Sequence, residues 1–270
     1  VALEVALRRF VGPRNQQFPT SVWLVGVTHL GTSNYYARLQ RFLDAQEFVL
    51  FEGIGATHRN FRTLESGGFS LQPALARALH LRFQLTSVDH DRTNWINSDL
   101  GIRDLERHLP SDGKSVGMDQ LMAVFQGEGA FGGVARLGVT LLGSSAYLQA
   151  TAKLMLIETL DGFDGFLPGG MDFGIDTEKL MKVLIEERNA VVIRDLRRLL
   201  KRNPKPRSIA IFYGAGHMPD LEKRLRQELG WKSVEEQWLR AFGVDPSRAG
   251  LSPAEVTTIR TSVQSELRRK

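Results

Sequence analysis

Apolar and polar residues alternate in runs that predict a strand-rich opening to the chain. Residues 3–10 and 20–28 have the pattern of two strands, and the turn-rich GPRNQQFP between them predicts a hairpin. Helical spacing follows in NYYARLQRFLDA, where Ser33 and Asn34 are candidate N-caps. The apolar run EFVLFEGI is then expected to be a short buried strand. Strand, helix and strand in this order predict a parallel crossover unit.

The alternation of helix and strand patterns continues briefly and then stops. LQPALARALHLR has helical spacing, and FQLTSVDHD has the pattern of a strand. From about Asp99 to Lys201 the periodicity is mostly helical, with breaks at Pro110 and in the glycine-rich GEGAFGG and GFDGFLPGG. We therefore expect a helical insertion, about residues 99–202, between two halves of a sheet.

The C-terminal part returns to strands and helices. RSIAIFYGAGH is expected to be a strand, MPDLEKRLRQELG a helix closed by Gly230, and WKSVEEQWLRAF a final edge strand. Ser252 as N-cap, Pro253 at the first helical position and Glu255 at the third predict a last helix. The expected fold is a single α/β domain over residues 1–245, with a central, mostly parallel mixed sheet flanked by helices. A helical tail, residues 246–270, is expected to follow it.

Composition and charge narrow the classes of function. The 270 residues include no cysteine, which excludes disulfides and thiol nucleophiles and leaves His and carboxylates as ligands for any metal. The net charge is +5, but the excess lies largely between Arg188 and Arg207, at spacings that suit the solvent face of a helix. Aromatic residues are not interleaved with these charges as base stacking requires. We therefore expect no nucleic-acid partner.

No segment has the pattern of a membrane span. The longest apolar region, Val134 to Leu160, is interrupted by Arg136 and Lys153. The chain begins at a valine and not at a methionine, so we expect that an upstream segment was removed by processing or cloning. Membrane association through such a segment is compatible with the sequence; the location stays unknown, with an extracytoplasmic or membrane-anchored one favoured.

Three predicted strands end in polar residues, at His29, Glu52 and His217. C-terminal ends of parallel strands meet at one edge of a sheet, where open α/β proteins bind ligands. Glu52 follows a wholly apolar run, and a buried carboxylate without a partner costs several kcal/mol, so we expect a cation or a protonated group beside it. The alternative is a salt bridge to an arginine that only stabilises the fold.

Glycines precede both histidines in the same way. Gly26 and Gly214 lie three residues before His29 and His217, where the missing side chain allows a sharp turn and leaves room beside the imidazole. Gly216 adds a second permissive position. One Gly-x-x-His also fits a core histidine with a satisfied hydrogen bond, but two copies at strand ends favour a functional site.

Charged residues elsewhere supply further candidates. In EERN, residues 186–189, the two glutamates and Arg188 are adjacent along a helix, so no two share one face and one of them is expected to point inward. Asp89, His90 and Asp91 end another predicted strand and are candidates for additional ligands, although an Asx-rich turn explains them equally well.

Four short motifs carry a resemblance to a known family. They are Gly26-Val-Thr-His29, Glu52 within LFEG, Glu187-Arg188-Asn189, and Gly214-Ala-Gly-His217 followed by Met-Pro. In order and spacing, over roughly residues 20–240, they resemble the signature of the TraB/PrgY/GumN family, which is related to the Tiki proteases. The resemblance implies an erythromycin-esterase/ChaN-like α/β fold in which both Gly-x-x-His motifs and the glutamate meet in one cleft. Tiki proteins are described as divalent-metal-dependent proteases, and TraB-type bacterial relatives are linked to shutting down peptide pheromone signals.

The motifs and the resemblance together lead to a metal-dependent hydrolase that acts on a peptide or protein. His29, Glu52 and His217 would hold Mn²⁺, Co²⁺ or Zn²⁺ with a position open for water, whose pKa the metal lowers. Glu187 would act as general base and Arg188 would stabilise the oxyanion, both contributed by a helical lid over the sheet edge. The roles of Glu52 and Glu187 are interchangeable in this hypothesis.

Other classes of function stay open. In a metal-free esterase, a histidine would activate water directly and a glutamate would orient it. The wider superfamily also contains a haem-binding lipoprotein, so a non-catalytic haem binder with a histidine or Tyr213 as ligand is a second alternative. A chain that keeps the fold without the chemistry is the third.

Overall fold

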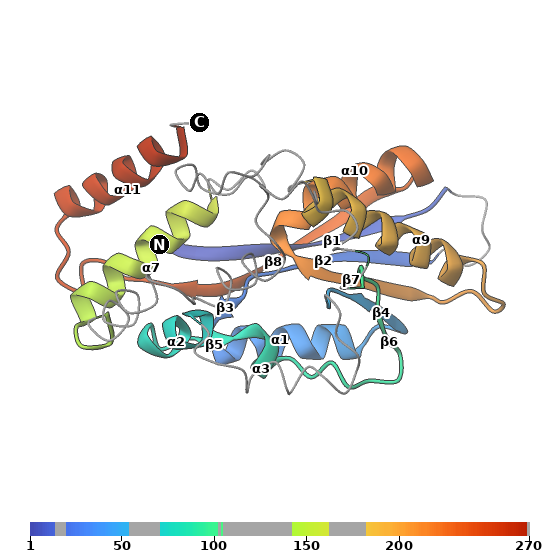
Figure 1. Cartoon of the computed structure of the whole chain (residues 1–270), viewed down its shortest axis with the longest axis horizontal. Coiled ribbons are helices and arrows are strands. Elements are labelled where there is room, and N and C mark those ends of the chain that lie inside the picture. Colours follow the sequence, from blue (N-terminus) through green and yellow to red (C-terminus); the bar gives the residue numbers. More distant parts are fainter. Residues whose placement is uncertain (14–19, 54–70, 102–103, 105–141, 162–181, 269–270) are drawn as a thin grey trace, which may run out of the picture.

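A six-stranded mixed sheet forms the centre of an α/β fold (Figure 1). The computed structural model describes residues 1–13, 20–53, 71–101, 104, 142–161 and 182–268. The strand order is β6-β4-β7-β2-β1-β8. The strands are β1 (Ala2–Val11), β2 (Ser21–Val27), β4 (Phe48–Phe51), β6 (Trp95–Asn97), β7 (Ser208–Gly214) and β8 (Lys232–Gly243). A separate antiparallel pair joins β3 (Leu30–Gly31) to β5 (Arg82–Phe83).

Helix α1 (Ser33–Asp44) packs on one face of this sheet, and α9 (Arg188–Leu200) and α10 (Met218–Leu229) pack on the other (Figure 1). The other described helices are α2 (Leu71–Ala78), α3 (Gln84–Ser87), α7 (Ala146–Asp161) and α11 (Pro253–Arg268). A π-helical segment, η1 (Lys182–Glu187), runs into α9, and a 3-10 turn, η2 (Ala215–His217), runs into α10. None of the helices in the described ranges is long and apolar enough to span a bilayer.

Successive side chains of a strand point to opposite faces of the sheet, so each central strand contributes to two separate apolar clusters. Trp23 and Val25 of β2 belong to the apolar cluster that includes α1, whereas Val22 and Leu24 belong to the cluster that includes α9 and α10. Burial on both faces explains why the central strands are continuous apolar runs. Polar residues are therefore expected only where such a strand ends.

The predicted opening of the chain is confirmed. β1 and β2 pair antiparallel, with Leu7 opposite Val25, as the predicted hairpin requires. The crossover through α1 connects β2 to β4, but these two strands are not neighbours in the sheet. β7 lies between them and is parallel to both. The N-cap of α1 is Thr32, whose hydroxyl accepts from the Tyr35 N–H at 3.2 Å, and not Ser33 or Asn34.

The strand predicted over residues 83–91 is wrong. Phe83 ends β5, and residues 84–87 form the short helix α3, because Gln84 N–H donates to the His29 carbonyl (2.9 Å) and Val88 N–H donates back to Gln84 (3.0 Å). The strand that joins the sheet is β6, where Trp95 pairs with Val49. The preceding helix α2 also ends earlier than predicted, at Ala78.

The described part of the predicted insertion is helical. It comprises α7, η1 and α9, whereas the breaks predicted at Pro110, GEGAFGG and GFDGFLPGG lie outside the described residues. Most of the predicted lid lies outside them as well. The described helix α9 covers one face of the sheet and begins at Arg188.

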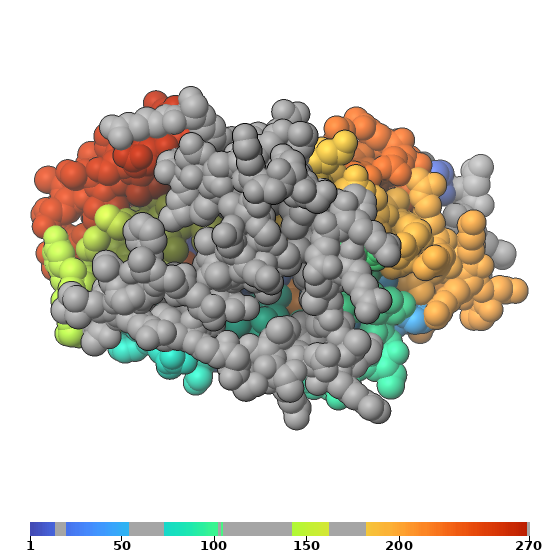
Figure 2. All heavy atoms as spheres, viewed as in Figure 1, coloured from blue at the N-terminus to red at the C-terminus, as the bar shows by residue number. Residues whose placement is uncertain are grey.

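The C-terminal predictions are confirmed. Gly230 closes α10 with φ 67°, and β8 pairs with β1 alone as the edge strand. Ser252 and Glu255 form a capping box, with Ser252 N–H donating to Glu255 Oε2 at 2.7 Å. α11 packs against α7, where Arg260 donates to Glu158 at 2.7 Å. This helix pair lies at one end of the molecule, and α9 and α10 lie at the other (Figure 2).

Candidate functional site

Glu52 lies at the C-terminal edge of the parallel strands, directly after β4. Its Oε1 accepts from Arg188 Nη2 at 2.6 Å, and its Oε2 accepts from the Gly214 N–H at the end of β7 at 2.7 Å. Burial alone would raise the pKa of this carboxyl. The charges of Arg188, His217 and His29, with the Gly214 N–H, outweigh burial and lower the pKa to about 2. Glu52 is therefore ionised, and its partner is the guanidinium of Arg188, the arginine salt bridge that the sequence analysis gave as the alternative.

Arg188 is buried, and all five of its N–H groups have acceptors. Nε donates to Asp99 Oδ1 and Nη2 to Asp99 Oδ2, both at 2.8 Å, and Nη2 also donates to Glu52. Nη1 donates to the Leu184 carbonyl and to His217 Nε2, both at 3.3 Å. Burial opposes the charge, but these carboxylates raise the pKa of the guanidinium further above its ordinary value. No N–H group of Arg188 is left to stabilise an oxyanion, the role predicted for it.

Asp99 is the site residue that the sequence analysis missed. Its side chain has no exposed surface, and its two oxygens also accept from Gly53 N–H (2.9 Å) and Leu100 N–H (2.8 Å). The polar run after WI, at the end of β6, is the signal that could have identified it. This signal was missed because the strand was predicted at residues 83–91. The residues that follow the actual strand, β6, were then assigned to the start of the helical insertion.

His217 is buried and held in one orientation. Asn189 Oδ1 lies 2.8 Å from Nδ1, and Asn189 Nδ2 donates to the His217 carbonyl (3.2 Å) and to Asp220 (2.9 Å). The amide oxygen therefore faces the ring, which puts the proton on Nδ1 and leaves Nε2 as acceptor for Arg188. Burial lowers the pKa of His217 to about 4, although the Glu52 carboxylate, 3.7 Å from Nε2, acts in the opposite direction. The imidazole is neutral at neutral pH.

His29 lies near the same edge but is exposed to solvent. Its Nδ1 lies 3.0 Å from Oε1 of the buried Gln84, in α3, which places the ring proton on Nδ1. Nε2 then carries the lone pair, and no described residue hydrogen-bonds to it. His29 is close enough to Glu52 for its positive charge to favour the ionised carboxylate.

The two glycines that precede the histidines have different roles. A Cβ on Gly214 would lie 3.2 Å from Glu52 Oε2 and 3.8 Å from His217 Cδ2, so the missing side chain leaves room beside the imidazole, as predicted, and more critically beside the carboxylate. A Cβ on Gly26 would lie 2.9 Å from Val5, so this glycine permits close packing of β1 on β2. Among the described glycines, Gly214 and Gly216 do not have positive φ, so neither is required by a left-handed turn.

Two predicted site residues, Asp89 and Glu187, are not part of this cluster, whereas Tyr213 packs edge-on against the ring of His217, with ring centroids 5.1 Å apart. The Tyr213 hydroxyl donates to the Ser98 carbonyl at 2.5 Å, and burial raises its pKa well above 10, which opposes ligation of haem as a phenolate. Asp89 accepts from Asp91 N–H and Arg92 in an exposed Asx turn. The side chain of Glu187 makes no hydrogen bond or ion pair with a described residue, so no contact supports it as general base.

The residues of this arrangement do not fit a metal ion. Within the described ranges, no three His, Asp or Glu side chains are grouped so as to hold one. The guanidinium of Arg188 lies between Glu52 and His217, bonded to both, at the place where a shared ion would be bound. A divalent cation there would lie against a buried positive charge, and the lone pair of His217 is already used.

In the basic stretch 188–207, Arg194, Arg197 and Arg198 face solvent as predicted, whereas Arg188 is buried. Arg194 and Arg198 pair with Asp195, and Arg197 pairs with Glu228. These ion pairs within the chain reduce the positive charge available to a nucleic acid.

Comparison of the chain with protein-family models, with curated proteins and with solved structures finds no match. The fold class rests on the structure, and the function must be argued from the side chains at the sheet edge.

Proposed function

We propose that this protein is a hydrolase of ester or amide bonds, peptides first among them, in which His29 is the general base. The observation that supports this role is the exposed imidazole of His29, oriented by Gln84, beside the ionised Glu52. A base hydrogen-bonded to an orienting group is the arrangement that general-base hydrolysis needs.

The reaction needs only a water molecule and these side chains. Nε2 of His29 takes a proton from water while the water oxygen bonds to the carbonyl carbon of the substrate. When the tetrahedral adduct breaks down, the imidazolium returns that proton to the leaving oxygen or nitrogen. A positioned general base of this kind contributes roughly 10²- to 10⁴-fold to the rate.

Arg188 and His217 act in this proposal by fixing Glu52. The ion pair with Arg188 and the N–H of Gly214 hold both carboxylate oxygens, so Glu52 keeps one orientation and stays charged.

The metal-dependent peptidase implied by the family resemblance is the main competing proposal. It requires Arg188 to leave its place between Glu52 and His217, with its five hydrogen bonds rearranged. Activity measured with and without chelator distinguishes it from the metal-free hydrolase.

The test is hydrolysis of a panel of chromogenic esters and a fluorogenic peptide library by wild type, His29→Gln and His80→Asn. His80 is the matched control, because it lies at the end of α2 with φ 52°, a conformation that asparagine tolerates. We expect His29→Gln to lose roughly 100-fold or more of the activity, with the thermal melting temperature unchanged. Full activity in His29→Gln would refute the proposed base, and loss of wild-type activity on chelation would favour the metal-dependent enzyme.

A further inference from the structure

β8 is the last strand of the sheet, and no strand in the described part of the chain lies beside its outer edge. β1 pairs with the inner edge along the whole strand. The backbone N–H and C=O groups of an outer edge are available to a strand of another chain. At Ala241 the carbonyl is already used, because it accepts from the Thr32 N–H at 2.8 Å. The open part of this edge therefore ends at Arg240.

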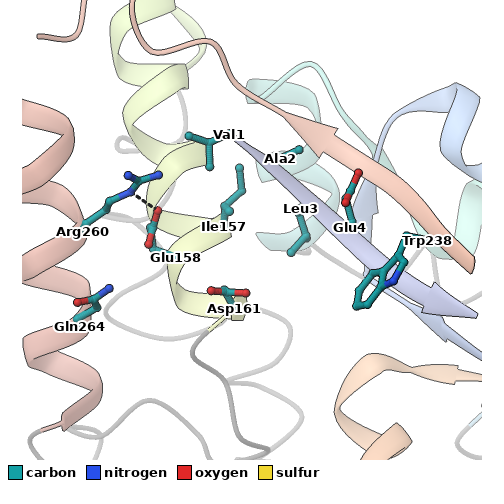
Figure 3. Close-up of a pocket in the computed structure, with 10 residues that line it drawn as sticks. All are labelled: Val1, Ala2, Leu3, Glu4, Ile157, Glu158, Asp161, Trp238, Arg260 and Gln264. Carbon is teal, nitrogen blue, oxygen red and sulfur yellow. Dashed lines mark hydrogen bonds and ion pairs between the residues drawn. The ribbon is translucent and has the colours of Figure 1, made fainter. Parts of the chain in front are cut away.

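The most exposed tryptophan of the chain lies in this open part. Trp238 is 53% exposed, whereas each of the other three tryptophans is at most 8% exposed. It lies opposite Ala6 of β1, and it lines the same surface hollow as Glu4, so both are on one face of the sheet (Figure 3). Its indole N–H donates to Glu236 Oε1 at 2.9 Å, so the ring leans toward that residue. A large apolar side chain at an open strand edge is suited to contact with another chain.

Opposite charges lie two residues before and two residues after Trp238. Glu236 lies opposite Arg8 of β1, and Arg8 Nε donates to its carboxylate. Arg240 lies opposite Glu4 and makes no ion pair with any described residue. Residues two apart on a strand share a face of the sheet. Glu236, Trp238 and Arg240 therefore form one row beside the open edge.

This row is complementary to itself in one register. In an antiparallel pair, opposite residues point to the same face, so a two-fold axis at Trp238 places Glu236 opposite Arg240 of the second copy, and the reverse. An axis at Glu236 or at Arg240 would place like charges opposite each other, and an axis at Gln237 would pair neither charge. An axis at Leu239 shortens the pair, because it cannot pass Arg240.

The register centred on Trp238 also continues the charge pattern of the sheet. Across β1, β8 and the same two strands of a second copy, the row becomes Arg8, Glu236, Arg240 of the second copy and Glu4 of the second copy. The signs alternate throughout, and opposite charges directly across a strand pair stabilise it. Because the indole of Trp238 leans toward Glu236, it also meets the incoming arginine in a cation–π contact.

We propose that this protein forms a two-fold symmetric dimer in which two β8 edges pair antiparallel over residues 236–240, centred on Trp238. Interfaces that bury less than ~1,200 Å² are weak and transient, so for this short pair we expect a dissociation constant of about 1–100 μM. Glu52 follows β4, which lies near the opposite edge of the sheet. The dimer does not depend on the proposed hydrolysis, so each proposal can fail without the other.

Sedimentation velocity on the full chain, from about 1 to about 300 μM, measures the association. We expect a monomer at the lowest concentration and mostly dimer at the highest. The fluorescence of Trp238 should shift to shorter wavelength over the same range, because the indole leaves water. A chain that stays monomeric at the highest concentration overturns the proposal, and the edge would then be open to a strand of another protein.

Charge exchange tests the register. Glu236→Lys and Arg240→Glu each place like charges opposite each other and should weaken self-association roughly tenfold or more. Lys232→Glu, the same change of charge at the start of β8, should leave it unchanged. Mixed in equal amounts, the two variants again bring opposite charges together, so a heterodimer should form with about the wild-type affinity.

Circular dichroism and the melting temperature check that each variant is folded. Arg240→Glu decides alone if Glu236→Lys does not fold, because Arg240 makes no ion pair with a described residue of its own chain. Unchanged self-association in Arg240→Glu overturns the proposal, as does the absence of a heterodimer between two folded variants.

Discussion

The ion-pair cluster predicts different stabilities for two isosteric substitutions, Asp99→Asn and Glu52→Gln. Each substitution removes one negative charge from Arg188 without changing the shape of the side chain. The two carboxylates differ in burial, since the Asp99 side chain is 0% exposed and the Glu52 side chain is 19% exposed. They also differ in hydrogen bonds, because Asp99 accepts four and Glu52 accepts two.

The magnitude follows from these contacts. In Asp99→Asn one oxygen becomes an NH₂ group, which faces one N–H of Arg188 and one backbone N–H, both buried and left without an acceptor. Breaking a buried, hydrogen-bonded ion pair of this kind costs about 3–5 kcal/mol. In Glu52→Gln one donor loses its acceptor and water can reach the site, so the cost is about 1–2 kcal/mol. The free energy of unfolding should therefore fall by about 2 kcal/mol more in Asp99→Asn.

Urea denaturation at neutral pH measures the difference. Far-ultraviolet circular dichroism and tryptophan fluorescence should give coincident transitions, which is the condition for comparing the three proteins by a two-state analysis. The double variant provides the coupling energy, and it should be less stable than the sum of the single effects predicts, because Arg188 is then buried with no carboxylate. Equal losses in the two single variants, or a larger loss in Glu52→Gln, would refute the assignment of Asp99 as the main partner of Arg188.

The same site makes three further predictions. His217 has a pKa of about 4 in the fold and 6.5 as a free side chain. The free energy of unfolding is therefore fully kept above pH 6.5 and falls by about 2–3 kcal/mol as the pH drops toward 4. In His217→Asn, the difference in stability between neutral pH and pH 4.5 should shrink by this amount, and an unchanged difference would contradict the buried neutral imidazole. Gly214→Ala should lower the free energy of unfolding by about 1–2 kcal/mol, because its Cβ would press on the Glu52 carboxylate, whereas Gly101→Ala, where the nearest atom lies 3.5 Å away, is the control. Gln84→Leu should reduce the proposed hydrolysis about tenfold through loss of the orienting hydrogen bond to His29, and retention of full activity would show that Gln84 does not position the base.

Much of the fold follows from local pattern. Central strands such as 208–214 are apolar on both faces, and the residues at which they end can be found by eye. The glutamate after FVLF and the histidine after the Gly-x-Gly segment lie together at one edge, 3.7 Å apart, because parallel strands must end on the same side. Helix ends such as Ser252 and Gly230 follow from capping chemistry that acts within a few residues.

Other parts depend on contacts that a local pattern does not contain. The alternating residues 83–88 suit a strand, but the hydrogen bond from Gln84 to the His29 carbonyl turns them into a helix, and the true strand is only three residues long. The donors of Arg188 are filled by groups 4 to 136 residues away in the chain. Sequence reasoning therefore predicted that one charged residue of EERN points inward, and could not predict that this residue is Arg188 with no N–H group left for a substrate.

The position of β7 between β2 and β4 has a consequence for the order in which the protein can be built. On the ribosome, β2 and β4 emerge early, but in the described structure they do not pair with each other. Each pairs with β7, so this part of the sheet can form only after residues 208–214 have been synthesised. A nascent chain that stops before β7 can form the β1–β2 hairpin and the β4–β6 pair as separate pieces, with open edges and with no Gly214 to hold Glu52. Because the last strand to reach the middle of the sheet joins these pieces, folding must close very long loops late, which makes it slow and exposes the intermediate to aggregation.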